Sequence, residues 1–402
     1  MAPGPRRLPE APDAPGPRRV ENYTRGVWAV EVVFWSSLGL LAWTHLGYPI
    51  FAWVLARVHP KRIAVADSTP QIALIIAAHN EEDVLERRIA NLLELDYPEH
   101  ALQIVIASDA STDATDAIAA RFAAAHERVE LLVCPRGGKV AAQDRAVRAT
   151  DSELIAFSDA NATWAPDALR WLVRPFADER VGYVCGRLRL ERADGSNREG
   201  AYWRYELWLR AQESAMGSVT GGNGSVYAVR RSDYAEIDTR FGHDLSFPYV
   251  MAQGGRRAVY EPRALAFEKP SRDLEDEFKR KVRMFEHCWL MVLRGGMFRG
   301  GGTVFIAQLI SHRLLRYASG VLHLALLASS AALAGSGIVF AVVLALQLGG
   351  LLLAGAGRFG LRVPGSGLAL YYVLITWATV VALVRYLRFG VPAVWEKAEG
   401  TR

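Results

Sequence analysis

The sequence predicts an α/β domain with a mainly parallel β-sheet, flanked at both ends by helices that cross a membrane. Short apolar runs alternate with amphipathic helical patterns between about residues 70 and 268. This alternation is typical of parallel strands joined by crossover helices. Longer apolar stretches precede and follow this region, and each has enough residues to span a bilayer.

Composition and charge agree with this division. The chain has 402 residues, of which 51% are apolar, and the apolar residues gather towards the two ends. The net charge of +5 is too small to indicate nucleic acid as a partner, but it suits a protein that lies against anionic lipid. Cys134, Cys185 and Cys288 are far apart in sequence and form neither a disulfide framework nor a metal pattern, so we expect a reducing compartment.

The N-terminal part divides into a tail and an apolar helix. Residues 1–25 are rich in Pro, Gly, Ala and Arg without periodicity, which predicts a disordered tail. Residues 27–58 are long and apolar enough for a transmembrane helix, which Pro49 is expected to bend. A buried core helix is the alternative for this stretch.

The central region supplies the strands of the predicted sheet. They are expected at Ile72–Ala77, Gln103–Ala107, Val129–Val133, Leu154–Phe157 and Val181–Cys185. An aromatic helix at Tyr202–Leu209 follows a turn at Asp194–Asn197. A glycine loop at Thr220–Ser225 precedes a further strand at Val226–Val229.

The C-terminal part reads as membrane-associated. Residues 272–300 carry apolar side chains at helical spacing opposite charged ones, which predicts an amphipathic helix lying in the membrane interface or packed on the soluble domain. Residues 303–390 hold about three spans, and residues 391–402 form a second tail. Four spans would place both tails opposite the soluble domain, whereas their basic residues favour the cytoplasm. A re-entrant or interfacial run would remove this conflict.

Polar segments follow four of the predicted strands. They are Ala78–Glu82, Ser108–Asp113, Arg136–Lys139 and Asp159–Asn161. The carboxyl ends of parallel strands meet in one crevice, where open α/β sheets bind ligands. Acidic side chains there can bind a base and a ribose, Lys139 at a helix N-terminus can meet phosphate, and Asp159 can hold Mg²⁺ or Mn²⁺. Helix caps at Asn80, Ser111 and Asp159 and a turn at Asn161 are the alternatives.

Together these segments resemble the membrane-bound family 2 glycosyltransferases, which include the cellulose, hyaluronan and poly-N-acetylglucosamine synthases. The resemblance covers nearly all of the chain after the tail. It implies a GT-A (Rossmann-like) nucleotide-sugar-binding domain at residues 70–268 with N- and C-terminal transmembrane helices. The implied enzyme is an inverting transferase of the hexosyltransferase type that takes a sugar from a nucleotide-sugar, expected to be a UDP-sugar. It would lie in the plasma (inner) membrane with its catalytic domain in the cytoplasm.

The resemblance also assigns donor-side residues. Ile75–Glu82 is similar to the family's opening strand and nucleotide-contacting turn, which implies donor contacts for Asn80 and Glu81. Asp109 matches the aspartate that contacts the nucleotide. Lys139 is a further expected donor contact.

Two more motifs are implied to bind the metal ion and to contain the general base. Asp159-Ala160-Asn161 falls at the metal motif, usually Asp-Ala-Asp, so Asp159 and Asn161 are implied to hold Mg²⁺ or Mn²⁺. The uncharged Asn161 predicts a weaker grip on the metal. Asp244 falls on the general base, which takes the proton of the attacking hydroxyl, and His243 replaces the acid before it. A helix cap is the alternative for Asp244.

The last motif aligns with Arg280–Met284. Arg280 and Arg283 can hold a diphosphate, but the usual tryptophan is Met284, which weakens the prediction of processive polymerisation. The glycine loop and the aromatic helix resemble acceptor-side elements, which assigns Trp203, Gly222 and Asn223 to the acceptor. Simple packing of the aromatic residues is the alternative.

The expected partners are a nucleotide-sugar donor, a glycan or lipid-linked acceptor and membrane lipids, with no nucleic acid. Four spans are few for a pore, so product export would need a partner or an oligomer. A single transfer to a lipid carrier is one rival function. The other is a catalytically degenerate GT-A fold that serves as a membrane scaffold or partner subunit, which the departures at Asn161, His243 and Met284 favour.

Overall fold

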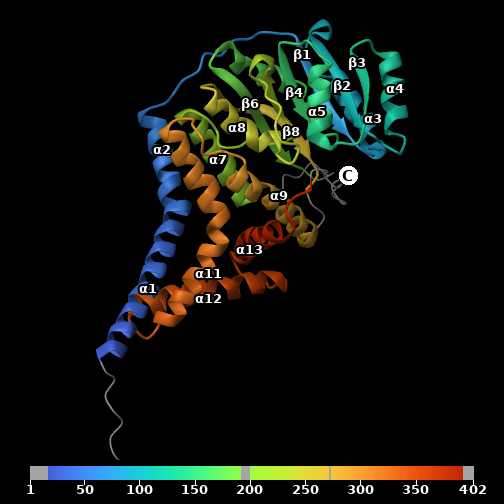
Figure 1. Cartoon of the computed structure of the whole chain (residues 1–402). Coiled ribbons are helices and arrows are strands. Elements are labelled where there is room, and N and C mark those ends of the chain that lie inside the picture. Colours follow the sequence, from blue (N-terminus) through green and yellow to red (C-terminus); the bar gives the residue numbers. More distant parts are fainter. Residues whose placement is uncertain (1–16, 192–199, 271–272, 393–402) are drawn as a thin grey trace, which may run out of the picture.

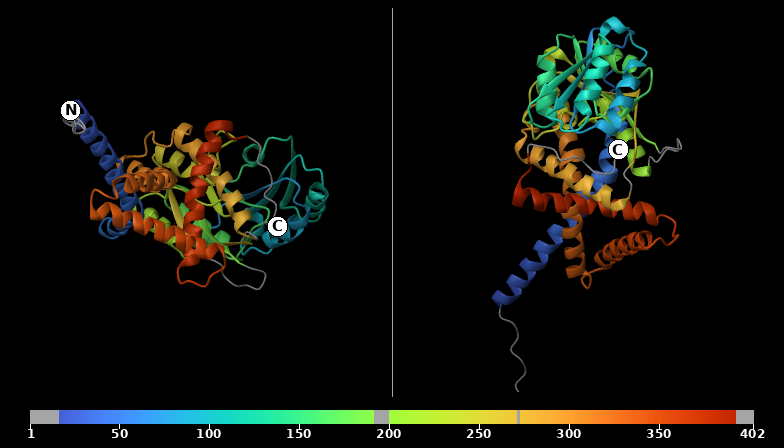
Figure 2. Two further views of the ribbon diagram at one scale, coloured as in Figure 1. Left: turned by 90° about the horizontal axis from the view of Figure 1, so that it is seen from below. Right: turned by 90° about the vertical axis from the view of Figure 1, so that its right-hand side faces the viewer.

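The computed structural model describes residues 17–191, 200–270 and 273–392. An α/β domain forms one end of the molecule and a group of long helices forms the other (Figures 1 and 2). The predicted turn at Asp194–Asn197 and most of both predicted tails lie outside the described residues.

One mixed sheet forms the centre of the domain. Among the described residues it has eight strands in the order β3-β2-β1-β4-β7-β6-β8-β5. The strands are β1 Ile72–Ala78, β2 Leu102–Asp109, β3 Val129–Cys134, β4 Leu154–Ser158, β5 Thr163–Trp164, β6 Val181–Leu190, β7 Tyr227–Arg230 and β8 Arg257–Glu268. Strands β1 to β4 pair in parallel, β7 runs antiparallel to β4 and β6, and β8 is parallel to β6 and antiparallel to β5. The predicted α/β fold with a mainly parallel sheet is confirmed.

Helices cover both faces of this sheet. They are α3 Glu82–Leu93, α4 Thr115–Ala125, α5 Lys139–Arg148, α6 Ala168–Val173, α7 Ala201–Met216 and α8 His243–Gln253. Strand β1 shows why both faces are buried. Ile72, Leu74 and Ile76 enter a core with α3, α4 and α6, whereas Ala73 and Ile75 enter a second core with α5 and α8. Alternate residues of a strand point to opposite faces, so a strand buried on both sides reads as one continuous apolar run.

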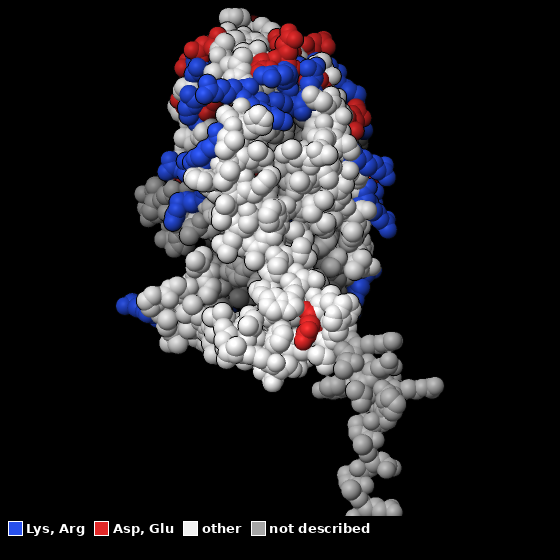
Figure 3. Space-filling view, turned by 90° about the vertical axis from the view of Figure 1, so that its left-hand side faces the viewer, with Lys and Arg blue, Asp and Glu red and all other residues white. Residues whose placement is uncertain are grey.

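Within the described ranges, the helical end contains four stretches long and apolar enough to cross a membrane: Val27–Val58, Thr303–Leu333, Ile338–Arg358 and Ser366–Phe389. The elements there are α1 Pro17–Ala42, η1 Trp43–Gly47, α2 Tyr48–Val58, α9 Leu274–Arg294, α10 Thr303–Gln308, η5 Leu309–Leu314, α11 Leu315–Leu333, α12 Ile338–Arg358 and α13 Ser366–Phe389. Figure 3 shows charged side chains gathered over the α/β domain and a broad, nearly uncharged surface below it. This surface is the one that a membrane would cover.

Two of these stretches contain a π-helical turn. Turn η1 lies just before Pro49, and turn η5 lies between α10 and α11. The two turns meet, since the Trp43 indole N–H donates to Ser311 Oγ at 3.0 Å. Proline has no N–H to donate, and a π turn beside it is one of the places where a helix can bend, so the bend at Pro49 stays a prediction. Helix α1 begins at Pro17, inside the stretch predicted as a tail, so residues 17–25 are helical rather than disordered.

Helix α13 lies along α9. The Tyr371 hydroxyl donates to Glu277 Oε1 at 3.2 Å, and Arg385 Nε lies 2.6 Å from Glu286 Oε1. These contacts join the early and late parts of the two helices in the same order. The apolar face of α9 is buried between α13 and α8, so this helix packs on the soluble domain as well as on a membrane helix.

Candidate active site

The predicted polar segments do meet at one edge of the sheet. Strand pairing places Ala78 beside Ser108, Asp109 beside Cys134, and Ile76 beside Ser158. The segments that follow β1, β2, β3 and β4 therefore leave the sheet side by side. This is the edge at which open α/β sheets bind ligands.

Asp109 holds the turn that precedes α5. Its Oδ1 accepts the Gly137 N–H at 2.7 Å, and its Oδ2 accepts the Gly138 N–H at 3.0 Å and pairs with Arg136. Gly138 has φ 88°, a conformation that glycine adopts without strain. The buried carboxylate of Asp109 thus shapes the turn that delivers Lys139.

The ends of β1 and β2 carry strained backbone. Asn80 and Ala110 have φ of 56° and 54°, a region that residues other than glycine rarely occupy. Asn80 Oδ1 accepts the Thr112 N–H at 2.8 Å, which ties the two strand ends together. Strain held by such cross-links is common at functional sites. The helix cap is Glu81 rather than Asn80, because α3 begins at Glu82.

A cluster of charges lies beyond β4. Lys139 Nζ pairs with Asp159 Oδ1, and the Ser225 hydroxyl lies 3.3 Å from Asp159 Oδ2 and also bonds Glu268 Oε1. Burial and the charge on Asp159 raise the pKa of Glu268 to about 7. Burial disfavours the charge on Lys139, but Asp159 outweighs this and raises the pKa of the amine. Two carboxylates and one cation thus share a half-buried position.

Asp159 is not a helix cap, since the next helix begins at Ala168 with Asp167 as its cap. Behind the cluster, the buried guanidinium of Arg88 donates to Ser158 Oγ at 2.7 Å. Burial lowers the pKa of Arg88 to about 9, although Asp159 and Glu268 oppose this change. The site therefore has a second positive charge beneath its carboxylates.

Asp244 lies in the first turn of α8, where Gly242 rather than Asp244 is the cap. Removal from water raises the pKa of the Asp244 carboxyl, an effect that Lys139 opposes and Asp159 reinforces. The main chain of Asp244 is fixed by the glycine loop, because its carbonyl accepts the Gly222 N–H at 2.7 Å. A carboxylate with a raised pKa beside a cation has the character of a general base.

His243 is a core residue. Its ring stacks on Phe247 at a centroid distance of 4.5 Å, and its Nδ1 lies 3.2 Å from the Tyr227 hydroxyl. Burial lowers the pKa of His243 to about 3, so the imidazole is neutral near pH 7. The histidine that replaces an acid in the sequence motif therefore packs the sheet beneath Asp244.

Arg280 of α9 lies near this cluster. Arg280 donates to Glu277 Oε2 at 3.0 Å and favours ionisation of Glu268, which places its charge near the carboxylates. Arg283 is one helical turn further on and half-buried, and Met284 is exposed.

The acceptor-side residues differ in their surroundings. The Asn223 amide donates to the Gly186 carbonyl at 2.6 Å, and its Oδ1 accepts the Val226 N–H at 3.0 Å, so this side chain braces the glycine loop. A Cβ placed on Gly224 would lie 3.4 Å from Lys139 Nζ, which shows how closely the loop approaches the charges. Trp203 donates its indole N–H to the Leu188 carbonyl at 3.1 Å and packs on the main core.

Sequence reasoning missed Ser225 and Glu268. Glu268 ends β8, a strand interrupted by Glu261, Pro262 and Arg263 and therefore without a clean alternation. Within the described ranges, no three His, Cys, Asp or Glu side chains gather closely enough to hold a metal alone. Asp159 and Glu268 nevertheless offer hard carboxylate oxygens in one place, and a bound diphosphate and water can supply the remaining oxygens that Mg²⁺ or Mn²⁺ needs.

A parallel set of strands that ends in a carboxylate cluster, followed by a mixed second half of the sheet, is typical of the GT-A class of fold. The comparison with solved structures agrees. A mannosyltransferase from Pyrobaculum calidifontis, solved with GDP-Man and Mn²⁺, superposes with a TM-score of 0.65 at 24% identity, covering 89% of this chain and 99% of that one.

Residues 73–237 match the family described as glycosyl transferase family 2, so the chain carries a domain of this family. A beta-monoglucosyldiacylglycerol synthase from Nostoc is 31% identical over 213 residues, which is 51% of this chain and 46% of the relative. A poly-beta-1,6-N-acetyl-D-glucosamine synthase from Staphylococcus epidermidis is 22% identical over 272 residues, 62% of this chain and 66% of the relative. The chain spans about half the length of the first of these relatives and two thirds of the second.

Proposed function

We propose that this protein is a membrane-associated, inverting glycosyltransferase that moves a sugar from a nucleotide-sugar, expected to be a UDP-sugar, to a glycan or lipid-linked acceptor. The observation that carries the proposal is the pairing of Lys139 with Asp159 at the strand ends of a family 2 domain, with Asp244 of α8 close enough for its charge to act on Lys139. In this proposal the donor-binding edge, the cation site and the base are close enough for their charges to act on one another.

The donor lies along the strand ends in this proposal. Asn80, Glu81 and Asp109 would contact the nucleoside from the ends of β1 and β2. Lys139, Arg280 and Arg283 would bind the diphosphate. Lys139 is paired with Asp159 in the structure, and a cation on Asp159 would release this amine towards the phosphates.

Asp159 and Asn161 would hold Mg²⁺ or Mn²⁺, with Glu268 as the carboxylate that the motif lacks at Asn161. When bound, the metal neutralises charge on the departing diphosphate. Glu268 suits this role because Ser225 links it directly to Asp159. The residues present therefore fit a hard divalent cation.

Asp244 would act on the acceptor. It takes the proton of the acceptor hydroxyl while that oxygen bonds the anomeric carbon and the bond from this carbon to the diphosphate oxygen breaks. Attack from the face opposite the diphosphate inverts the anomeric carbon. Its raised pKa brings the carboxylate nearer to the working pH, where a general base is most effective.

The two candidate acceptors are a growing glycan and a lipid. Met284 leaves no tryptophan at the end of the α9 motif, which removes one stacking platform for an acceptor sugar. A relative is named for making a glycolipid and another for making a polysaccharide. A single transfer to a lipid is the second candidate, and the length of the product distinguishes it from polymerisation.

The expected location is the plasma (inner) membrane, with the α/β domain in the cytoplasm, where nucleotide-sugars are made. The four apolar helices and the nearly uncharged surface of Figure 3 support the membrane part of this proposal.

The test is turnover of a panel of nucleotide-sugars by the full chain in lipid nanodiscs, with and without Mn²⁺. We expect release of the nucleoside diphosphate from one donor, and Asp244→Asn should lower kcat by roughly 10²–10⁴-fold with UDP affinity retained. Equal turnover by Asp244→Asn would contradict the assigned base. If the wild-type protein binds no nucleoside diphosphate, the result would contradict the proposed glycosyltransferase function and favour the role of a membrane scaffold.

A further inference from the structure

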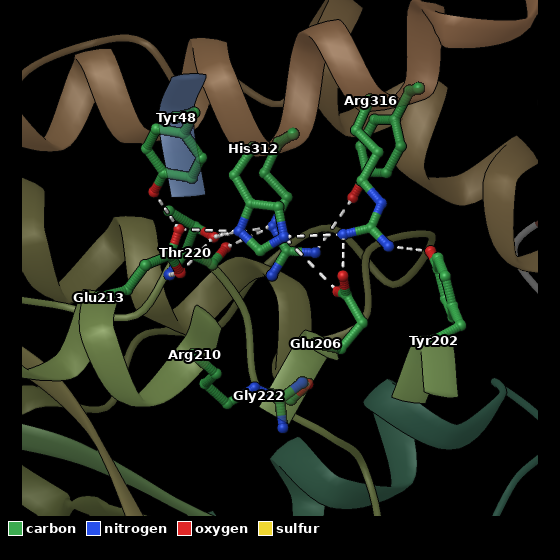
Figure 4. A network of polar contacts seen from close by, with 11 residues as sticks. Tyr48, Tyr202, Glu206, Arg210, Glu213, Thr220, Gly222, His312 and Arg316 are labelled. Atoms are coloured by element: carbon green, nitrogen blue, oxygen red, sulfur yellow. Dashed lines mark hydrogen bonds and ion pairs between the residues drawn. The ribbon is translucent and has the colours of Figure 1, made fainter. Parts of the chain in front are cut away.

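A buried polar network joins the membrane helices to the glycine loop (Figure 4). We define the Glu213 network as Glu213 of α7, Tyr48 of α2, His312 and Arg313 of η5, and Thr220 of the loop. The side chains of Glu213 and His312 are 1% and 3% exposed. An ionised carboxylate at this depth is stable only if its oxygens are fully bonded.

Glu213 is bonded from three directions. Its Oε1 accepts from the Tyr48 hydroxyl at 2.5 Å and lies 2.8 Å from His312 Nδ1. Its Oε2 accepts both the backbone N–H of Thr220 at 3.1 Å and the Thr220 hydroxyl at 2.9 Å. Burial opposes the charge, but His312, Arg313 and Tyr48 together lower the pKa of Glu213 to about 2. The Glu213 carboxylate is therefore ionised near pH 7.

Arg313 holds the same loop from the membrane side. Its Nε donates to the Thr220 carbonyl at 3.2 Å and to the Thr220 hydroxyl at 3.0 Å. A Cβ on Gly221 would overlap the Arg313 guanidinium, so the loop is glycine where the arginine packs against it. The hydroxyl and both main-chain polar groups of Thr220 are thus used by residues outside the loop.

The glycine loop, which Glu213 and Arg313 hold in place, is itself hydrogen-bonded to the candidate active site. Two residues after Thr220, the Gly222 N–H donates to the carbonyl of Asp244, and Arg210 Nη2 donates to the Gly222 carbonyl at 3.0 Å. Three residues after Gly222, Ser225 bonds the carboxylates of Asp159 and Glu268. One short loop therefore touches both the candidate base and the candidate metal ligands.

The π turns explain how membrane helices reach this loop. A π turn widens a helix and redirects its side chains, and such turns often occur at functional sites. His312 and Arg313 both lie within η5, and Trp43 of η1 bonds Ser311 of η5.

We propose that Thr220, Glu213 and Arg313 are positioning residues, which fix the glycine loop and through it the main chain of Asp244. This inference rests on the proposed function. It makes the contact between α2, α7 and η5 a part of the catalytic geometry, and it predicts that loosening Thr220 harms turnover more than donor binding.

The test compares Thr220→Val with Thr220→Ser in the full chain in nanodiscs. Valine has nearly the same shape but no hydroxyl, whereas serine keeps the hydroxyl. We expect Thr220→Val to lower kcat about tenfold or more, with the donor KM and UDP affinity within about twofold, because small displacements of reacting groups cost rate. Thr220→Ser should retain more than half of the wild-type kcat.

The matched control is Tyr372→Phe. This change removes hydroxyl contacts with His45 and His323 in the same membrane region, and in the part of the chain that the structure describes none of its hydrogen bonds reaches the loop. Wild-type kcat is expected. Equal kcat for Thr220→Val and Thr220→Ser, or an equal loss in Tyr372→Phe, would overturn the proposal.

Amide hydrogen exchange gives a readout that needs no turnover. Peptides covering residues 219–226 and 243–246 should exchange about tenfold faster in Thr220→Val than in Thr220→Ser or Tyr372→Phe. If wild type has no activity, this comparison still decides the inference, and the proposed function alone has failed. If Thr220→Val does not fold, Tyr48→Phe replaces it, and unchanged exchange there would overturn the proposal.

Discussion

At the scale of single residues, the pairing of Asp159 with Glu268 decides how a cation would be held. The sequence predicts Asp159 and the uncharged Asn161 as ligands of the metal ion, but it does not predict a second negatively charged ligand. The fold supplies one from the end of β8, joined through Ser225. Residues distant in sequence became neighbours through strand order, which composition and spacing do not reveal.

Glu268→Gln should weaken Mn²⁺ binding in the presence of UDP by about tenfold or more, because a carboxylate oxygen is lost from the cation site. Mn²⁺ binding measured by electron paramagnetic resonance would show this change without any turnover. Glu261→Gln is the matched control, since Glu261 lies on the same strand but pairs with Arg263. Equal Mn²⁺ affinities for the two variants would refute the role of Glu268.

Asp144 gives a prediction for pH. Burial raises the pKa of its carboxyl to about 6, above the value near 4 of an unfolded chain. The folded state thus binds this proton more tightly, so stability falls as pH rises from about 4 to about 6 and then stays lower.

Asp144→Asn should remove that fall, because asparagine can still accept the Tyr234 hydroxyl that now bonds Asp144 Oδ1. We expect a gain of about 1–3 kcal/mol at pH 7.5 and little change at pH 4. Thermal unfolding at both pH values measures it. A gain of the same size at pH 4 would show that ionisation is not the cause.

At the scale of elements, the glycine loop lies so close to the sheet that one of its positions has no space for a Cβ atom. A Cβ on Gly222 would overlap the Tyr183 hydroxyl, a buried group without a hydrogen-bond partner among the described residues. Tyr183 lies on β6, so loop and sheet touch through a hydroxyl that makes no compensating bond.

Gly222→Ala should destabilise the protein by about 1–3 kcal/mol through overpacking. In a Tyr183→Phe background the same change should cost clearly less, because the overlapping oxygen is gone. Thermal unfolding of the four proteins gives the coupling between the two positions. Gly254→Ala is the control, since a Cβ there meets only ordinary contacts at 3.6 Å. Additive losses would argue against the overlap.

The same scale shows which elements the sequence could predict. Strands β1 to β4 were predicted within two residues, because each is a short, mostly apolar run. Strands β1, β2 and β4 are buried almost throughout, whereas β3 at the sheet edge has exposed residues. Strand β8 was missed because Glu261-Pro262-Arg263 interrupts it. The strand ends also located Asn80, Asp109, Lys139 and Asp159 at one edge. The Glu213 network was beyond prediction, since helical spacing does not reveal which helix packs on which.

At the scale of the whole molecule, the packing of the helices bears on the topology that the sequence left open. Four candidate spans are present, yet α13 lies along α9, which packs on the α/β domain. Figure 1 shows the start of α1 far from that domain and the end of α13 close to it. This arrangement suits the re-entrant or interfacial alternative. In that alternative, α12 and α13 together bring the chain back once to the side of the membrane on which the α/β domain lies.

We therefore predict that Gly390→Cys reacts with a membrane-impermeant maleimide from the same side as Asp67→Cys, and Ser336→Cys from the opposite side. Gly390 is exposed at the end of α13, Ser336 is exposed in the turn between α11 and α12, and Asp67 pairs with Arg174 of the α/β domain. The three native cysteines are buried, so the wild-type chain serves as the unlabelled control. Labelling of Gly390→Cys together with Ser336→Cys would instead establish α13 as a full span.

Glu213 also bears on how such a protein can be divided. A shortened chain covering residues 60–270 would keep Glu213 and Thr220 but lose Tyr48, His312 and Arg313, three of the groups that satisfy the buried carboxylate and its loop. The catalytic domain and its anchor are therefore not interchangeable modules. A chimaera with a foreign anchor would have to bring equivalent hydroxyl, imidazole and guanidinium groups to the same places.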